Sequence, residues 1–235
     1  MTSVRELESA KTVEVVFAGD DVRLAGQIDY PHFSPPPDGY PLLFFIHHAG
    51  GNRRSAFAHY TQAALEVGYA VFRWDKRGTG RSGGSGRGSA TQDAVNAYET
   101  ALEQPKINRH RAVILAQCSG SVLFGSAFGL FARVEKPHGV ILAGNKLDET
   151  EIQAIDTNLK IIMGEQDFMP WEKYGKAACE AHNAMYKYHA SYYVAPKANR
   201  LLVADTTASS PMLPSEAKAV LQNWLTELCP ISAAI

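Results

Sequence analysis

The segment with the most chemistry in this sequence is centred on a cysteine. The apolar run Ala112–Ala116 leads almost directly to Cys118, and small residues, Ala116 and Gly120, stand two positions to either side of it. A buried strand that enters a helix through so tight a turn presents the side chain at the turn, and bulky neighbours there would collide with nearby backbone. A thiol in that position can act as a nucleophile in acyl transfer.

The turn also favours Cys118 electrostatically. The helix expected after it would point free N–H groups and a positive dipole end at the thiol, which can lower its pKa and stabilise an oxyanion. A structural interpretation is also open, because free cysteines are often simply small buried residues. Ser119 is a second candidate nucleophile, but it would place Gln117 where a small residue is needed. We therefore prefer Cys118.

The elements that must position this turn alternate along the chain. The expected strands are apolar runs of strand length: Leu42–His47, Tyr69–Trp74, Ala112–Ala116, Gly139–Ala143, Leu159–Met163 and Leu201–Ala204. The expected helices are Ala56–Glu66, Thr91–Glu103, Val122–Ala132, Trp171–His189 and Ser215–Leu228. Such alternation predicts a parallel sheet with right-handed crossovers.

Two further strands are expected near the amino terminus. Thr12–Phe17 and Val22–Asp29 flank a polar turn, which indicates an antiparallel hairpin at the sheet edge. We therefore predict one three-layer α/β domain over residues 1–235, with a mostly parallel sheet of about eight strands.

Composition excludes several classes of function. The chain has 235 residues, 46% of them hydrophobic and 20% charged, and a net charge of −1, so nothing indicates a nucleic-acid or anionic-membrane partner. Three widely spaced cysteines indicate reduced thiols rather than a disulfide or zinc framework. With no signal-peptide pattern and no apolar run of membrane length, we expect a cytoplasmic protein that needs no cofactor or metal.

Four segments match, in chain order, motifs of the α/β-hydrolase family, which the sequence resembles. They are His47–Gly51 (HHAGG), Asp75–Ser82 (DKRGTGRS), the turn around Cys118 (AQCSG) and Met163–Asp167 (MGEQD). Residues 145–158, where relatives insert a lid, form only a short stretch. The chain is similar in this respect to small, nearly cap-free esterases and to dienelactone-hydrolase-like enzymes. The dienelactone-hydrolase-like enzymes also carry a cysteine at this turn.

The resemblance implies a role for each part of the site. Cys118 would be the nucleophile and Asp167 the acid of the triad, while the backbone N–H groups of Ala49 and Ser119 would form the oxyanion hole. The second segment, DKRGTGRS, would be structural. Asp148 is an alternative acid, although it can equally be a helix N-cap, with a glutamate three residues on.

The general base of the family is missing. The resemblance implies a histidine in the loop after the last strand, near Ala208 or Ser209, but no histidine follows His189. A thiol or hydroxyl nucleophile needs a base within hydrogen-bond reach and an acid that orients that base. The triad is therefore incomplete as the sequence stands.

Three interpretations are open. The chain can be a hydrolase derivative with weak or absent turnover, or another histidine (His48, His182 or His189) can supply the base. Alternatively, a thiolate stabilised by the helix can begin acyl transfer without a base. Losing one triad member typically leaves catalysis of about 10³–10⁴-fold over water.

Two other patterns are weaker. Gly78–Gly83 (GTGRSG) matches a dinucleotide fingerprint, but it does not follow its strand directly and no strand-end acid lies at the usual spacing of about 20 residues. The tyrosine-rich stretch Tyr186–Tyr193 can line an aryl pocket or simply end a helix and pack as a strand. Two functions remain: a hydrolase of small carboxylic esters, thioesters or amides acting through Cys118, and a non-catalytic protein of the same fold that binds a small acyl ligand.

Overall fold

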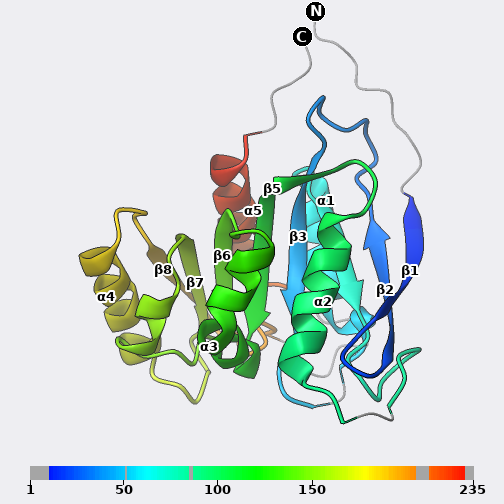
Figure 1. The fold of residues 1–235 in the computed structure, drawn as a ribbon. Coiled ribbons are helices and arrows are strands. Elements are labelled where there is room, and N and C mark those ends of the chain that lie inside the picture. Colours follow the sequence, from blue (N-terminus) through cyan, green and yellow to red (C-terminus); the bar gives the residue numbers. More distant parts are fainter. Residues whose placement is uncertain (1–10, 51, 85–86, 205–211, 231–235) are drawn as a thin grey trace, which may run out of the picture.

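The computed structural model describes residues 11–50, 52–84, 87–204 and 212–230, and an eight-stranded sheet forms its centre (Figure 1). The strand order is β1-β2-β4-β3-β5-β6-β7-β8. The strands are β1 (Thr12–Ala18), β2 (Arg23–Asp29), β3 (Tyr40–Ile46), β4 (Ala70–Trp74), β5 (Ile107–Gln117), β6 (Gly139–Ala143), β7 (Asn158–Gly164) and β8 (Ser191–Ala195).

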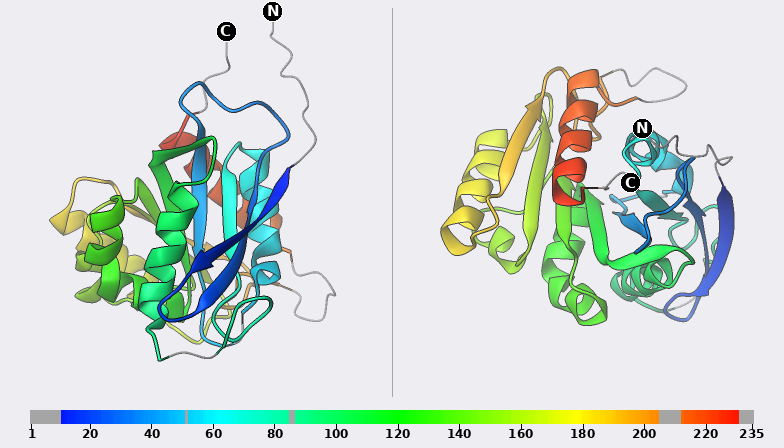
Figure 2. Two further views of the ribbon diagram at one scale, coloured as in Figure 1. Left: turned by 45° about the vertical axis from the view of Figure 1, so that its right-hand side comes forward. Right: turned by 90° about the horizontal axis from the view of Figure 1, so that it is seen from above.

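Helices cover both faces of the sheet, which gives the three layers expected from the sequence (Figure 2). Helices α1 (Ala58–Glu66) and α5 (Ser215–Leu228) pack on one face, and α2 (Ala90–Leu102), α3 (Ser119–Val134) and α4 (Ala178–Met185) on the other. None of the helices in the described part of the chain is long and apolar enough to cross a membrane.

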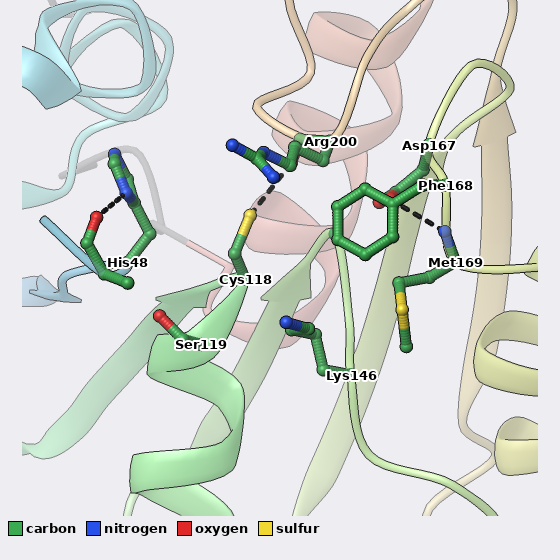
Figure 3. Close-up of a pocket in the computed structure, with 10 residues that line it drawn as sticks. His48, Cys118, Ser119, Lys146, Asp167, Phe168, Met169 and Arg200 are labelled. Carbon is green, nitrogen blue, oxygen red and sulfur yellow. Dashed lines mark hydrogen bonds between the residues drawn. The ribbon is translucent and has the colours of Figure 1, made fainter.

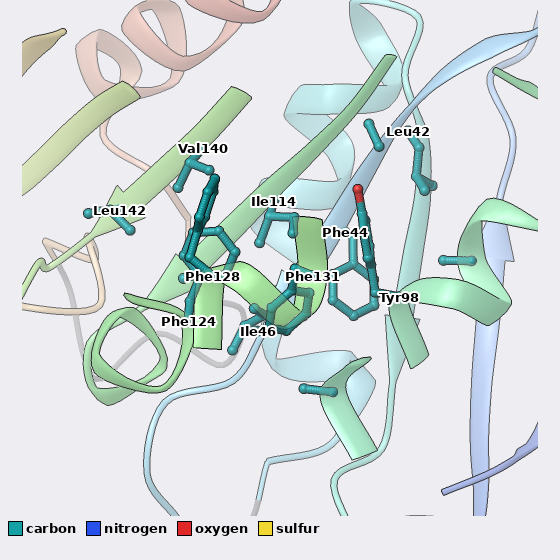
Figure 4. Close-up of a cluster of buried hydrophobic side chains, with 14 of the residues drawn as sticks. Leu42, Phe44, Ile46, Tyr98, Ile114, Phe124, Phe128, Phe131, Val140 and Leu142 are labelled. Atoms are coloured by element: carbon teal, nitrogen blue, oxygen red, sulfur yellow. The ribbon is translucent and has the colours of Figure 1, made fainter. Parts of the chain in front are cut away.

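Strand β3 shows why apolar runs without alternation predicted central strands. All seven of its residues are buried. Phe44 belongs to the hydrophobic cluster under α2 and α3, whereas its neighbours Leu43 and Phe45 belong to the cluster under α1 and α5. Successive side chains of a strand point to opposite faces, so a strand covered on both sides needs apolar residues at every position. Figure 4 shows the first of these clusters.

The pairing of the strands fixes where a site can form. Strand β1 pairs antiparallel with β2, as the hairpin prediction required, and β2 pairs antiparallel with β4. All other neighbours, from β4 to β8, are parallel. The carboxyl ends of six strands therefore meet at one edge of the sheet, which is where open α/β sheets bind ligands.

One predicted strand is wrong. Leu201–Ala204 is not a strand, and the last strand of the sheet is Ser191–Ala195. The side-chain oxygen of Asn199 accepts the N–H of Leu201 at 2.8 Å, and Leu202 has a φ of 58°. These features make the segment a turn. It is apolar because Leu202 is fully buried against the core.

The long helix predicted over Trp171–His189 is shorter than expected. It begins as a π-helical turn, Glu172–Ala177, continues as α4 and ends at Met185. His189 lies in the connection to β8 with a φ of 54°. The helix therefore leaves the tyrosine-rich stretch to the connection and to the edge strand.

Candidate active site

Cys118 occupies a strained turn between β5 and α3. Its φ and ψ are 50° and −117°, a conformation that non-glycine residues rarely adopt. Its N–H donates to the carbonyl oxygen of Ala143 at 2.9 Å, which ties the turn to β6. A Cβ on Gly120 would lie 2.7 Å from the carbonyl oxygens of both Ile46 and His47. The small residue after the cysteine is thus required by close backbone approach.

The turn opens into a small pocket of about 90 Å³ at the carboxyl edge of the sheet (Figure 3). Every residue lining it follows the carboxyl end of a parallel strand. The lining residues are His48 and Ala49 after β3, Cys118 and Ser119 after β5, Gly144 and Lys146 after β6, Asp167, Phe168 and Met169 after β7, and Arg200 after β8.

The four principal residues expected from the sequence come together in this pocket. Cys118, Asp167, Ala49 and Ser119 all line it. Ser119 is the first residue of α3, so its N–H has no partner within the helix and is free to bind a negatively charged oxygen. The catalytic roles of these residues stay predictions.

Asp148 has a different place. Its carboxylate accepts the N–H groups of Thr150 and Glu151, and the side chain of Glu151 accepts the N–H of Asp148. This reciprocal arrangement is that of a capping box at the start of a short helical turn. Residues 144–157 contain this 3-10 turn, Glu151–Ala154, as their regular structure, and Asp148 does not line the pocket.

The glycine-rich motif after β4 has a structural role. The carboxylate of Asp75 accepts the N–H groups of Arg54 and Arg81, and the N–H of Gly78 bonds to the carbonyl oxygen of Gly83. These bonds close the loop on itself. The dinucleotide fingerprint is therefore a coincidence of spacing, and none of its glycines lines the pocket.

The residue that faces Cys118 from the turn after β8 is Arg200. The thiol of Cys118 donates to the Arg200 carbonyl oxygen at 3.3 Å, and the Arg200 side chain lies beside the thiol in Figure 3. Ala208 and Ser209, where the sequence placed the missing base, lie outside the described residues. Because β8 ends at residue 195, the turn that reaches the thiol comes earlier than predicted.

Arg200 was missed because the wrong segment was taken as the last strand. The signal that could have found it is the run of tyrosine and valine in β8, residues that favour strands. A guanidinium has only donors and stays protonated in proteins, so it cannot accept the proton of a thiol. Arg200 therefore cannot act as a general base toward Cys118.

The histidines proposed as substitutes divide into two groups. His48 lines the pocket, its Nδ1 lies 2.5 Å from the carbonyl oxygen of Ala49, and burial lowers its pKa, so its imidazole is neutral at pH 7. His182 bonds to the carbonyl oxygen of Ile155, before β7, and His189 precedes β8. These two therefore lie toward the amino ends of the strands, away from Cys118.

The environment of Cys118 keeps it a thiol. Burial and, to a smaller extent, the negative charge of Asp167 raise its pKa to about 11. Arg200 and Lys146 act in the opposite direction, but less strongly. The prediction that the helix would lower this pKa is wrong, because the loss of water around the sulfur outweighs the favourable charges.

Asp167 has one unsatisfied oxygen. Oδ1 accepts the N–H of Met169 at 3.1 Å, whereas Oδ2 is buried and has no hydrogen-bond partner. Burial also raises the pKa of this carboxyl. A buried carboxylate oxygen without a donor is uncommon in proteins. Asp167 itself lines the pocket.

No group of three or more histidine, cysteine or acidic side chains in the described residues could hold a metal ion. The three cysteines are free and buried. The described site therefore consists of a thiol, a carboxylate, two cations, a neutral imidazole and backbone N–H groups.

The sequence matches no family model and no curated protein at a significant level. Solved structures do match. An esterase from Pyrococcus furiosus has a TM-score of 0.70 at 14% identity, covering 94% of this chain and 91% of that one. A dienelactone-hydrolase-like promiscuous phosphotriesterase from metagenomic libraries has a TM-score of 0.66 at 14% identity, covering 94% and 99%.

A third match is a lidless α/β serine hydrolase from Xanthomonas campestris, with a TM-score of 0.62 at 15% identity and coverage of 96% and 99%. At these identities the likeness concerns the fold. The strand order, the turn at Cys118 and these near-complete superpositions lead to one conclusion: the chain has the α/β-hydrolase fold.

Proposed function

We propose that the protein binds a small acyl compound against Cys118 and does not turn it over efficiently. The observation that carries this proposal is the contact of Arg200 with the thiol, because Arg200 is a permanent cation and cannot accept a proton. The pocket keeps the donors for an acyl oxygen, at Ala49 and Ser119, but lacks the group that would start and finish the reaction.

The chemistry of each step supports binding over turnover. With a pKa of about 11, the Cys118 thiol is almost entirely protonated at pH 7, so attack on an ester is slow. Once an acyl group is attached, water needs a base to release it. An acyl-enzyme formed here would therefore persist.

A second candidate, a slow hydrolase that uses His48 as base, is favoured by one specific observation. His48 lines the same pocket, and its lowered pKa keeps it neutral and able to accept a proton. In this alternative a rearrangement on substrate binding brings its ring to the thiol.

One experiment separates the two candidates. Purified protein is mixed with excess p-nitrophenyl acetate at pH 8, and p-nitrophenol release and intact mass are followed together. We expect slow release that stops near one equivalent, with one stable acetyl group that Cys118→Ala removes and Cys179→Ala does not. Continued release that His48→Gln abolishes would support the hydrolase instead. An adduct unaffected by Cys118→Ala would overturn the proposal.

A further inference from the structure

Two cationic side chains converge on one aromatic ring at the mouth of the pocket. The ammonium nitrogen of Lys146 lies 5.5 Å from the centre of the Phe168 ring, and the guanidinium carbon of Arg200 lies 5.4 Å from it. Figure 3 shows the ring between the two cations, beside Cys118. The Phe168 side chain is 62% exposed, so the ring is a surface feature and not part of the core.

Neither cation is paired with a carboxylate in the part of the chain that the structure describes. Within the described residues, no carboxylate forms an ion pair or hydrogen bond with the side chain of Lys146 or Arg200. Several other cations are paired with carboxylates, as Arg77 is with Asp93. A contact with an exposed ring contributes only about 0.5–1 kcal/mol and does not cancel a charge.

The charges that line the pocket do not balance. Lys146 and Arg200 contribute two positive charges, Asp167 one negative charge, and Cys118 and His48 none at neutral pH. The N–H of Ser119 and the positive end of α3 add to the same potential. A net positive pocket attracts an anion, and the donor pair at Ala49 and Ser119 would bind an acyl oxygen.

We infer that the ligand is a small carboxylate-bearing acyl compound, with its acyl carbon at Cys118 and its carboxylate within reach of the Lys146 ammonium and the Arg200 guanidinium. This inference rests on the proposed function and names the class of compound that the same pocket takes. Arg200 then recognises the charge of the ligand, because a guanidinium can bind a carboxylate through two parallel hydrogen bonds.

The test uses two probes of equal size that differ in one charge. Succinamate carries an amide acyl group and a carboxylate, whereas succinamide carries two amides. Each is titrated into the full-length protein at pH 7.5 and constant ionic strength, and Kd is measured from amide chemical shifts. We expect succinamate to bind at least about tenfold more tightly. Added salt should weaken succinamate alone.

Substitutions assign the effect to the two cations. Lys146→Gln and Arg200→Gln should each weaken succinamate about tenfold and leave succinamide within about twofold. Lys173→Gln is the matched control, because this lysine faces Asp148 outside the pocket. Equal affinity for both probes, with shifts around Cys118, would overturn the charge selectivity and leave the proposed function standing. Absence of binding by either probe would overturn both.

Discussion

The thiol of Cys118 and the backbone carbonyl oxygen of Arg200 are 3.3 Å apart and share a hydrogen bond. This contact joins the turn after β5 to the turn after β8, the two segments that must meet for a nucleophile and a base to react. The residue that this contact brings to the thiol carries a permanent cation, which cannot accept a proton.

Replacing Arg200 by histidine should restore catalysis. The new ring would replace the cation beside the thiol, and the unpartnered Oδ2 of Asp167, a residue of the same pocket, would orient it. A positioned general base contributes about 10²–10⁴-fold, so we expect Arg200→His to raise kcat/KM for p-nitrophenyl acetate by about 10²-fold. Steady-state release of p-nitrophenol measures it.

Two controls distinguish this gain from a loss of positive charge. Arg200→Gln removes the cation without adding a base and should show no comparable gain. The double variant Arg200→His with Asp167→Asn should lose most of the gain, because the ring is no longer held in one tautomer. A histidine variant no faster than Arg200→Gln would show that the base belongs elsewhere.

The reactivity of Cys118 should report its raised pKa. At a pKa of about 11, compared with 9.0 for an unperturbed thiol, the thiolate fraction at pH 8 is about 100-fold smaller. Alkylation of Cys118 by iodoacetamide, followed by peptide mass, should rise with pH well beyond pH 9. Asp167→Asn removes a charge that raises the pKa and should speed alkylation at pH 8, whereas Arg200→Gln should slow it. The opposite order would contradict this electrostatic account.

Much of this site could be predicted from the sequence because close packing constrains it locally. Gly120 has to be small where two backbone carbonyl oxygens approach, and β3 has to be apolar where helices cover both faces. The last strand could not be predicted in the same way. Apolar patterns report burial, and Leu202 is buried in a turn, while Tyr192 in the edge strand β8 is 37% exposed.

The pKa of Cys118 also could not be predicted from the sequence. The helix that follows the thiol is visible in the residue pattern, but it does not decide the direction of the pKa shift. The larger effects are the loss of water and the nearness of Asp167, a residue from another strand end. Both depend on how far the turns after β5 and β7 close over the sulfur, which only the folded arrangement fixes.

Backbone strain at the cysteine should be measurable as stability. A residue with φ of 50° and ψ of −117° costs on the order of 1–3 kcal/mol unless it is glycine. We therefore expect Cys118→Gly to be more stable than Cys118→Ala by about 1 kcal/mol, although glycine usually destabilises. Urea unfolding of both variants at pH 7 tests this. If the alanine variant is the more stable, the strain is not stored at this residue.

Acid should destabilise the protein through its buried histidines, and His59 allows a test away from the pocket. Burial lowers the pKa of His59 to about 4, and its Nε2 is buried without a partner beside Tyr60. Above about pH 6.5 both folded and unfolded states hold a neutral ring. Between pH 6.5 and 4 only the unfolded state takes up the proton, so stability falls as the pH falls.

His59→Phe removes this difference and the unsatisfied nitrogen together. It should raise the free energy of unfolding by about 1 kcal/mol at pH 7, and the advantage should grow by roughly 2 kcal/mol at pH 4.5. The pKa of His47 is also lowered to about 4, and this histidine is present in both proteins. The free energy of unfolding of the variant should therefore still fall with falling pH, but less steeply than that of the unsubstituted protein. Urea unfolding across this pH range measures both slopes, and parallel curves would mean that His59 is already protonated in the folded protein.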